Sequence, residues 1–98
     1  MRFDWDSRKA TANRRKHRVS FEEACTIFAD RSVLTTYDEI HSSGEERWVS
    51  IGMAQTARLL VVIHTWPVPD EADEETLRIV SARRANQREQ AIYLERRL

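Results

Sequence analysis

Two adjacent arginines follow a short strand pattern near the end of the chain. The segment from Thr76 to Val80 reads as a β-strand, and it continues through the sequence RIVSARRA, which contains Arg83 and Arg84, into a basic helical pattern. An arginine guanidinium is planar, stays charged at any working pH and can donate paired hydrogen bonds to phosphate oxygens. A strand that delivers two such groups to the edge of a sheet therefore indicates binding of RNA or DNA.

A histidine in the preceding apolar segment is a candidate for proton transfer. Because side chains alternate across a strand, the odd-numbered residues from Leu77 to Arg83 are expected on one face, and the even-numbered residues from Leu60 to Trp66 share one face. If these faces coincide, His64 and Arg83 both lie at strand ends beyond an apolar floor. Histidine titrates near neutrality, which suits acid–base catalysis, although a hydrogen-bonded histidine at the edge of the core explains the same position.

Each candidate arginine has a structural alternative. Arg83 can bind a phosphate or pair with an acid such as Glu89. Arg84 points the other way along the strand, which favours a structural role or contact with the RNA backbone. Arg47 begins another strand segment, where it either contacts the transition state or is a solvated strand end. Arg88, in the basic helical pattern, is a further candidate for RNA binding.

Cleavage of RNA without a metal has three chemical requirements. The 2′-hydroxyl must lose its proton, the pentacovalent phosphorus must be stabilised, and the leaving 5′-oxygen must be protonated. The sequence has no cluster of His, Cys and Asp with metal-ligand spacing, and it has neither a Walker loop nor a GxGxxG motif. We therefore expect no cofactor. If the chain is such a ribonuclease, Arg83 and Arg47 are expected to stabilise the phosphorane, and His64 or Lys16 to move protons.

Composition favours one small globular domain that spans residues 1–98. The chain has 98 residues, of which 41% are hydrophobic and 33% are charged. Its longest apolar run, Leu59 to Ile63, has five residues, far below the roughly 20 that a membrane-spanning helix needs. The first residues, MRFDWDSRK, do not read as a secretion signal, and the single Cys25 fits a helical core pattern. These features predict a cytoplasmic protein.

The net charge of zero conceals a separation of charge along the chain. Residues 1–20 carry seven basic and two acidic groups, and residues 78–98 carry six arginines and two acids. Residues 21–46 carry seven acids and one base, and residues 67–77 carry five acids and no base. A fold that brings the chain ends together would create one positive surface, but the blocks can also neutralise each other as solvated faces.

The pattern of elements predicts an α+β fold. Asp6 is a candidate N-cap for a helix to about His17, and Ser20 with Glu23 forms a capping box for a helix from Phe21 to about Ala29. We expect an antiparallel sheet of about four strands from the following segments: Val33–Tyr37, Arg47–Met53, Leu59–Trp66 and Thr76–Ala82. Gly44 marks a turn and Pro67 to Glu75 an exposed loop. A last helix begins near Ala85, with Ala91, Ile92 and Leu94 as its apolar contacts.

Four ordered segments resemble the BrnT toxins of bacterial toxin–antitoxin pairs. These segments are FDWDSRKATANRRKHRVSFEEACTIF, EERWVSIG, LLVVIHT and RIVSARRANQRE, and they cover nearly the whole chain except the 67–75 loop and the last few residues. The resemblance implies a RelE-like ribonuclease that inhibits translation by cleaving RNA. It also implies a BrnA-like antitoxin with a ribbon-helix-helix domain, a heterotetrameric complex, and contact with operator DNA through the antitoxin.

The resemblance implies two further site residues, and the chain differs from the family pattern at Arg18. Lys16 and His17 match the Lys-His pair of these toxins, which implies proton transfer by Lys16 and RNA contact by His17, although a helix C-terminus attracts cations in any case. The family usually has glycine where this chain has Arg18. Because a β-carbon strains a left-handed helix cap, Arg18 is expected to alter the helix end or to cost about 1 kcal/mol. The acidic 67–75 loop is also longer than the usual connection.

Other functions remain open from the sequence. The chain can be a catalytically weak binding module that pairs with the antitoxin and acts as co-repressor of their operon, or a basic interaction protein without an RNA role. Trp5, Trp48 and Trp66 suit a core or an interface, and one of them can stack on a base. His41 lies in a polar loop. A ribbon-helix-helix gene just downstream would favour a toxin or a co-repressor over the third reading.

Overall fold

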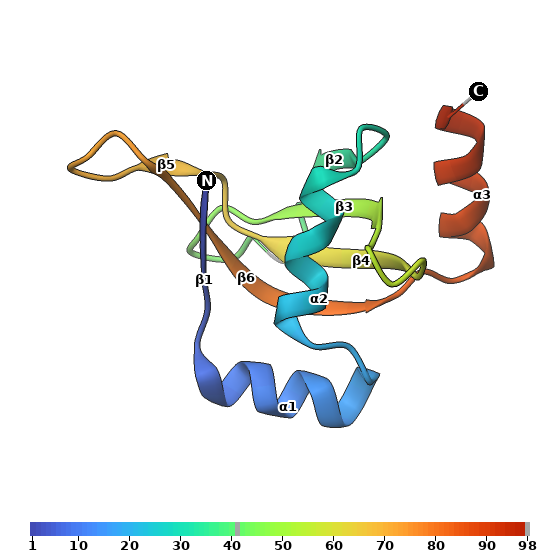
Figure 1. Ribbon diagram of the computed structural model, residues 1–98, viewed down its shortest axis with the longest axis horizontal. Helices are drawn as coiled ribbons and strands as arrows, with labels where there is room; N and C mark the ends of the chain where they lie inside the picture. Colours follow the sequence, from blue (N-terminus) through green and yellow to red (C-terminus); the bar gives the residue numbers. More distant parts are fainter. Residues whose placement is uncertain (41, 98) are drawn as a thin grey trace.

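The computed structural model describes residues 1–40 and 42–97, so His41 and Leu98 lie outside the described residues. Figure 1 shows its ten elements in chain order. They are β1 (Arg2–Asp4), α1 (Ser7–His17), α2 (Phe21–Cys25), the 3₁₀ helix η1 (Thr26–Ala29), β2 (Leu34–Tyr37), β3 (Trp48–Met53), β4 (Leu59–His64), β5 (Val68–Pro69), β6 (Glu75–Arg84) and α3 (Gln87–Arg97).

The strands form one mixed sheet in the order β1-β6-β4-β3-β2, with β5 also paired to β6. The α+β class and the four antiparallel strands β2, β3, β4 and β6 agree with the sequence prediction. The predicted count of about four strands is wrong, because β1 adds a parallel strand and β5 an antiparallel one. These two strands have three and two residues, too few to show an alternating pattern.

The first two helices begin at the predicted caps. Asp6 accepts hydrogen bonds from the backbone N–H groups of Arg8 and Lys9, at 2.8 and 3.1 Å. Ser20 accepts one from the N–H of Glu23 at 3.0 Å, so the capping position is confirmed. The predicted single helix from Phe21 to Ala29 instead tightens into 3₁₀ geometry at Thr26. Short 3₁₀ segments commonly end α-helices because the last carbonyls can then accept i→i+3 bonds.

Arg18 adopts the left-handed conformation at the end of α1. Its φ is 59° and its ψ is 32°, and its N–H donates to the carbonyl of Arg14 at 3.0 Å. The helix therefore ends as a glycine-capped helix would, with a β-carbon in a region that L-residues rarely adopt. The fold therefore contains a strained backbone conformation at Arg18.

The main core lies between the sheet and the helices α1 and α2. Figure 1 draws these two helices in blue and cyan. Its buried residues come from the α1–α2 connection, α2, η1, the β3–β4 turn and the strands β4 and β6: Val19, Phe21, Ala24, Ile27, Ala54, Leu60, Val62, Leu77, Ile79 and Ala82. Gly52 lets β3 approach η1 closely, because a β-carbon there would lie 2.9 Å from Cβ of Ile27.

The buried side chain of Asn13 forms hydrogen bonds with the edge of β6 beyond the residues that pair with β1. The side-chain amide of Asn13 donates to the carbonyl of Ala82 at 2.8 Å and accepts from its N–H at 3.1 Å. The same amide donates to the carbonyl of Val19 at 3.1 Å. Asn13 thus replaces a neighbouring strand at this position and fixes α1 against the sheet, because backbone groups buried without partners are costly.

A β-bulge in β6 changes which side chains share a face. His64 pairs with Ile79 and Ile63 pairs with Ser81, so Val80 is the extra residue. Beyond it, Ala82 is fully buried in the helix-covered core, whereas Ser81 and Arg83 lie on the opposite face. The prediction that the odd-numbered residues from Leu77 to Arg83 share one face is therefore wrong beyond the bulge.

The last helix docks through polar side chains. Asn86 and Glu89 form a reciprocal cap, in which each side chain accepts the other's backbone N–H at 2.9 Å. The predicted apolar contacts of Ala91, Ile92 and Leu94 are wrong, since Ile92 is 40% and Leu94 55% exposed. Tyr93 is buried instead, and its hydroxyl donates to Asp30 at 2.6 Å. In the part of the chain described here, no helix is long and apolar enough to span a membrane.

Candidate active site and RNA surface

His64 is part of a buried chain of hydrogen bonds. Its Nδ1 lies 2.7 Å from the carbonyl of Thr65, which can only accept, so Nδ1 carries the proton. Its Nε2 therefore accepts from the hydroxyl of Ser50 at 2.6 Å, and Ser50 accepts from the hydroxyl of Thr35 at 2.6 Å. Phe28 packs edge-on against the imidazole ring, with 5.0 Å between the ring centroids. Both ring nitrogens have partners, and His64 is only 2% exposed.

The surroundings of His64 favour its neutral form. Burial lowers the pKa of the imidazole below its usual value, and the bond to the Thr65 carbonyl only partly opposes this effect. Ser50 is fully buried, so an RNA hydroxyl does not reach the Ser50–His64 pair in this conformation. His64 therefore fits the structural alternative from the sequence analysis, a hydrogen-bonded histidine at the edge of the core.

Arg83 is held by an acid at its side. Its Nη1 and Nη2 donate to the two carboxylate oxygens of Glu89, each at 2.8 Å. The pair lowers the pKa of Glu89 and raises that of Arg83, because each charge stabilises the other. The Arg83 side chain is still 43% exposed. A guanidinium has five N–H donors, so Arg83 keeps donors for a phosphate while Glu89 fixes its orientation.

The structure does not bring the four predicted catalytic residues together. His64 lies on the helix-covered face of the sheet and Arg83 on the other, so the condition that their faces coincide is not met. Strand register places Arg47 at the opposite end of the sheet from Arg83, roughly 13 Å away along the strands and about 10 Å across them. Lys16 is exposed on α1. One phosphate cannot contact all four in this arrangement.

Arg47 lies beside the β2–β3 connection. Its backbone N–H donates to the Ser42 hydroxyl at 3.0 Å, and its carbonyl accepts from the N–H of Asp38 at 2.9 Å. Its side-chain Nε is buried and has no hydrogen-bond partner among the described residues. Arg47 is thus a half-buried strand-end residue rather than a freely solvated one.

A second cluster of cations lies where β4 begins and β6 ends, and it includes Arg58, which the sequence did not indicate. Arg58 donates to Glu23 through Nε at 2.8 Å and to the carbonyl of Arg18 through Nη2 at 2.9 Å. Leu60 pairs with Arg84, which places Arg84 on this helix-covered face, and Arg84 helps to lower the pKa of Glu23 after the larger effect of Arg58. The signal for Arg58 was weak, since a single arginine in a turn has no local pattern.

These side chains border two hollows in the surface. One, of about 450 Å³, lies between the β3–β4 turn and α3, and it is lined by Met53, Ala57, Arg58, Leu59, Arg84, Ala85, Gln90, Tyr93 and Leu94. The other is open, of about 660 Å³, and is lined by Thr11, Arg14, Arg15 and Arg18. Polar and cationic groups therefore continue from the α3 side of the molecule to α1.

The helix α1 presents cations without acids. Its eleven residues include no Asp or Glu, and its exposed cations, together with Arg18 at its cap, are Arg8, Lys9, Arg14, Arg15, Lys16 and Arg18. Among the residues that the structure describes, none of these six has an ion-pair partner. We call this helix with Arg58 and Arg84 the basic surface. An array of unpaired cations is the usual electrostatic signature of a phosphate-binding surface.

The remaining candidate residues lie at the end of α1, on the surface of α3 and against the core. His17 is half-buried at the end of α1, and Arg88 is exposed in the first turn of α3. Burial raises the pKa of the Cys25 thiol to about 11, so it stays protonated at neutral pH and is a poor nucleophile. Cys25 packs against the core cluster, as the sequence predicted. His41 lies outside the described residues.

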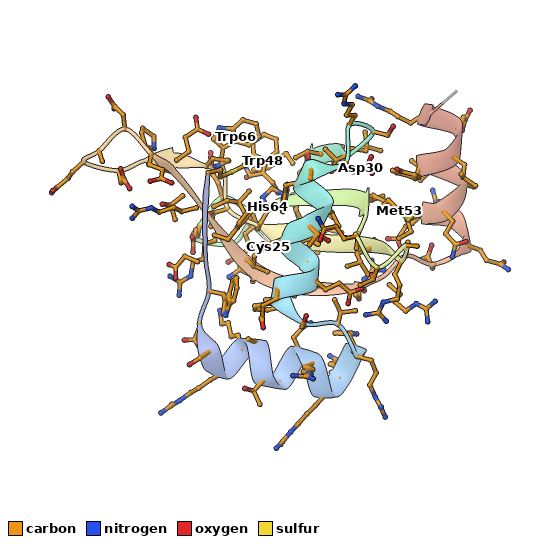
Figure 2. All side chains as sticks on the ribbon, in the orientation of Figure 1. Cys25, Asp30, Trp48, Met53, His64 and Trp66 are labelled. Atoms are coloured by element: carbon orange, nitrogen blue, oxygen red, sulfur yellow. The ribbon has the colours of Figure 1, made fainter. Side chains whose placement is uncertain are left out.

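The aromatic residues divide between the core and the surface. Trp5 packs against the core and meets Phe21 edge-on. Trp48 contacts Trp66, with ring centroids 4.6 Å apart, and also contacts Tyr37 at 5.3 Å. Trp66 is 54% and Tyr37 44% exposed. Figure 2 shows Trp48 and Trp66 close together, above His64 in this view.

The sequence and fold match one family of toxins. A family model described as the ribonuclease toxin BrnT of type II toxin–antitoxin systems matches residues 5–89. The chain belongs to this family. The structure is similar to the 1.1 Å crystal structure of the Brucella abortus ribonuclease toxin BrnT, with a TM-score of 0.64 and 25% sequence identity over 89% of this chain and 99% of that chain. A comparison with curated proteins found no match.

Membership of the BrnT family gives the chain a general role. It is a toxin of a ribonuclease family, and a type II system implies that an antitoxin protein is its partner. The family match runs from Trp5 to Glu89, so it includes α1, every strand of the sheet except β1, and both members of the Arg83–Glu89 pair.

Proposed function

We propose that this protein is a metal-independent endoribonuclease that cleaves RNA and so inhibits translation, and that its cognate antitoxin neutralises it. The observation that carries the proposal is the basic surface, where the acid-free helix α1 lies beside Arg58 and Arg84 in a chain with no net charge. Because phosphate contacts supply most of the affinity for nucleic acid, such a surface suits an RNA strand. Membership of a ribonuclease toxin family supports the same function.

Arg83 is the group that we assign to stabilisation of the phosphorane. It lies at the end of β6, next to Arg84 of the basic surface, and Glu89 holds its guanidinium in one orientation. A cation that is oriented before the reaction stabilises the developing charge without reorganisation, which typically accelerates a reaction about 10²- to 10³-fold. Arg84, Arg88 and His17 contact the RNA strand in this proposal.

The other predicted catalytic residues take different roles. His64 orients β3 and β4 through Ser50, since its buried, satisfied ring is poorly suited to exchange a proton with RNA. Lys16 is exposed on α1 and belongs to the basic surface, where it binds phosphate in this proposal. Arg47 holds the β2–β3 connection.

The partners implied by the family complete the proposal. The antitoxin is BrnA-like, with a ribbon-helix-helix domain that contacts operator DNA, and the two proteins form a heterotetramer. The toxin fold is of the RelE type, and the protein acts in the cytoplasm. An antitoxin segment with acidic side chains would cover the basic surface, because complementary charge speeds association and excludes RNA from the same place.

The decisive experiment separates RNA binding from the fold. The double variant Arg14→Ala/Arg15→Ala removes two exposed cations of α1 that make no ion pair with a described residue, and Arg31→Ala removes one exposed cation outside the basic surface as a matched control. We expect the double variant to bind a single-stranded RNA at least tenfold more weakly and to lose growth arrest, while Arg31→Ala keeps both. Unchanged RNA affinity in the double variant would refute the RNA surface.

A catalytically weak binding module is the second candidate. One observation favours it: among the described residues, no histidine lies beside Arg83, and the carboxylate next to it, Glu89, has a lowered pKa that makes it a weak base. Incubation of the purified protein with labelled RNA distinguishes the two. Cleavage that Arg83→Ala abolishes supports the enzyme, whereas tight binding of antitoxin with intact RNA supports the co-repressor.

A further inference from the structure

An exposed aromatic cluster lies at the end of the sheet that is remote from the basic surface. It consists of Tyr37 at the end of β2, Trp48 at the start of β3 and Trp66 just after β4. The ring of Trp66 packs at a tilt of 49° against that of Trp48, with 4.6 Å between the centroids, but Trp66 remains 54% exposed, and the neighbouring Val68 is 62% exposed. Large apolar side chains that gather on a surface mark an interaction site more often than scattered ones do.

Two acidic segments adjoin this cluster along the chain, one after Tyr37 and one after Trp66. The β2–β3 connection, residues 38–46, carries four acids and neither lysine nor arginine, and the β5–β6 hairpin, residues 67–75, carries five acids and neither lysine nor arginine. Glu39, Glu45 and Glu46 in the first segment are exposed, as are Glu71, Asp73 and Glu75 in the second. We call the cluster together with these six exposed acids the acidic aromatic surface.

The charge of this surface decides which partner it suits. RNA also stacks on tryptophan, but its phosphates would face the acids of both flanking segments, and like charges in contact disfavour association. A polypeptide that carries lysine or arginine has the opposite charge, and its cations can also lie over the tryptophan rings, which attract cations through their π electrons. The structure therefore favours a cationic polypeptide over RNA here.

We propose that the acidic aromatic surface docks a segment of a partner protein in which lysine or arginine side chains alternate with apolar ones. The apolar side chains contact Trp66, Trp48 and Val68, and the cations meet the flanking acids. The site uses none of the residues of the basic surface or of the Arg83–Glu89 pair. A partner bound here leaves the RNA surface open, so this inference does not rest on the proposed ribonuclease function.

The test uses a synthetic peptide of alternating leucine and arginine as the probe, with the leucine–glutamate peptide as its charge-reversed control. Binding to the full chain is measured by calorimetry and by tryptophan fluorescence, because Trp66 and Trp48 report directly on their surroundings. We expect the arginine peptide to bind and the glutamate peptide not to bind. Equal binding of both peptides would overturn the proposal.

Matched variants locate the peptide. Trp66→Ala should weaken peptide binding at least tenfold and Trp66→Phe much less, whereas Leu94→Ala, at a residue of the same exposure on α3, should leave it unchanged. Glu45→Gln/Glu46→Gln should weaken binding more than Glu22→Gln/Glu95→Gln does. Circular dichroism verifies the fold of each variant. Equal effects in the matched pairs would show nonspecific attraction and overturn the proposal.

Two further measurements exclude other occupants. Arg14→Ala/Arg15→Ala should keep full peptide binding, and Trp66→Ala should keep full RNA binding, so failure here is distinct from failure of the ribonuclease function. If Trp66→Ala weakens RNA binding and leaves peptide binding intact, the cluster stacks bases and the proposal is wrong. Concentration-dependent dimers that Trp66→Ala abolishes would show a second copy as the occupant, and would also overturn it.

Discussion

Glu89 holds Arg83 through two hydrogen bonds of 2.8 Å and also caps the helix α3 through the N–H of Asn86. One carboxylate thus orients the cation that we assign to catalysis and fixes the start of the last helix. Four residues further along α3, Tyr93 is bound to Asp30. Because residues i and i+4 share one face of a helix, the same face of α3 carries both polar contacts. In the mechanism that we propose, Glu89 therefore links the orientation of Arg83 to the docking of α3.

Arg83→Ala should abolish growth arrest and lower RNA cleavage about 10²- to 10³-fold. The same change removes a partly exposed ion pair, which should cost the fold about 1 kcal/mol or less after screening by solvent. Arg83→Lys should lose less activity, since it keeps the charge without the paired geometry. Activity is measured with labelled RNA and stability by urea unfolding.

Glu89→Gln is the control for this pair. It keeps the size of the side chain and a cap for α3 but removes the charge that orients Arg83, so we expect an intermediate loss of cleavage. A folded Arg83→Ala protein that still arrests growth would remove Arg83 from the mechanism. An Arg83→Ala protein that fails to fold would assign the pair a structural role.

Stability should fall as the pH decreases below about 6.5, the ordinary pKa of histidine. Burial lowers the pKa of folded His64, so the unfolded chain binds a proton first, and acidification then favours unfolding until the lower folded pKa is reached. One such group contributes at most about 1.4 kcal/mol per pH unit. Urea unfolding of the wild type and of His64→Gln between pH 7.5 and 5 measures it, with a flatter profile expected for the variant. Identical profiles would contradict the assignment.

Arg18→Gly should stabilise the protein by about 1 kcal/mol, because glycine adopts the left-handed conformation of this helix cap without strain. Ala12→Gly, at an exposed position inside α1, should destabilise by about 1 kcal/mol and serves as the control. RNA binding should weaken slightly in Arg18→Gly because one cation of the basic surface is lost. A destabilised Arg18→Gly protein would show that the arginine side chain makes a stabilising contact that outweighs the strain.

RNA cleavage should persist in EDTA, since in our proposal the arginines supply the charge stabilisation that a metal gives other nucleases. Within residues 1–40 and 42–97, no three His, Cys, Asp or Glu side chains gather as metal ligands do. The measurement is cleavage of labelled RNA with and without EDTA, using a metal-dependent nuclease as the positive control. Activity that EDTA removes and Mg²⁺ or Mn²⁺ restores would refute the proposed mechanism.

The sequence by itself determined the features that depend on nearby residues. The N-cap at Asp6, the cap at Ser20 and the left-handed position of Arg18 are set by contacts within one turn of helix, so their signals lie in adjacent letters. The four antiparallel strands follow from local alternation and composition. The family followed from the four motifs, because their residues occur in one order over most of the chain.

Only the tertiary structure decided which side chains meet. The bulge at Val80 moved Arg83 to the face opposite His64, and an inserted residue in a strand leaves no mark in an alternating pattern when both neighbours are small or apolar. The bond of Asn13 to Ala82 joins residues 69 positions apart. Arg58 and Glu23, which are joined by a hydrogen bond, likewise lie 35 positions apart in the sequence. Such contacts depend on how elements pack, so no short stretch of sequence contains them.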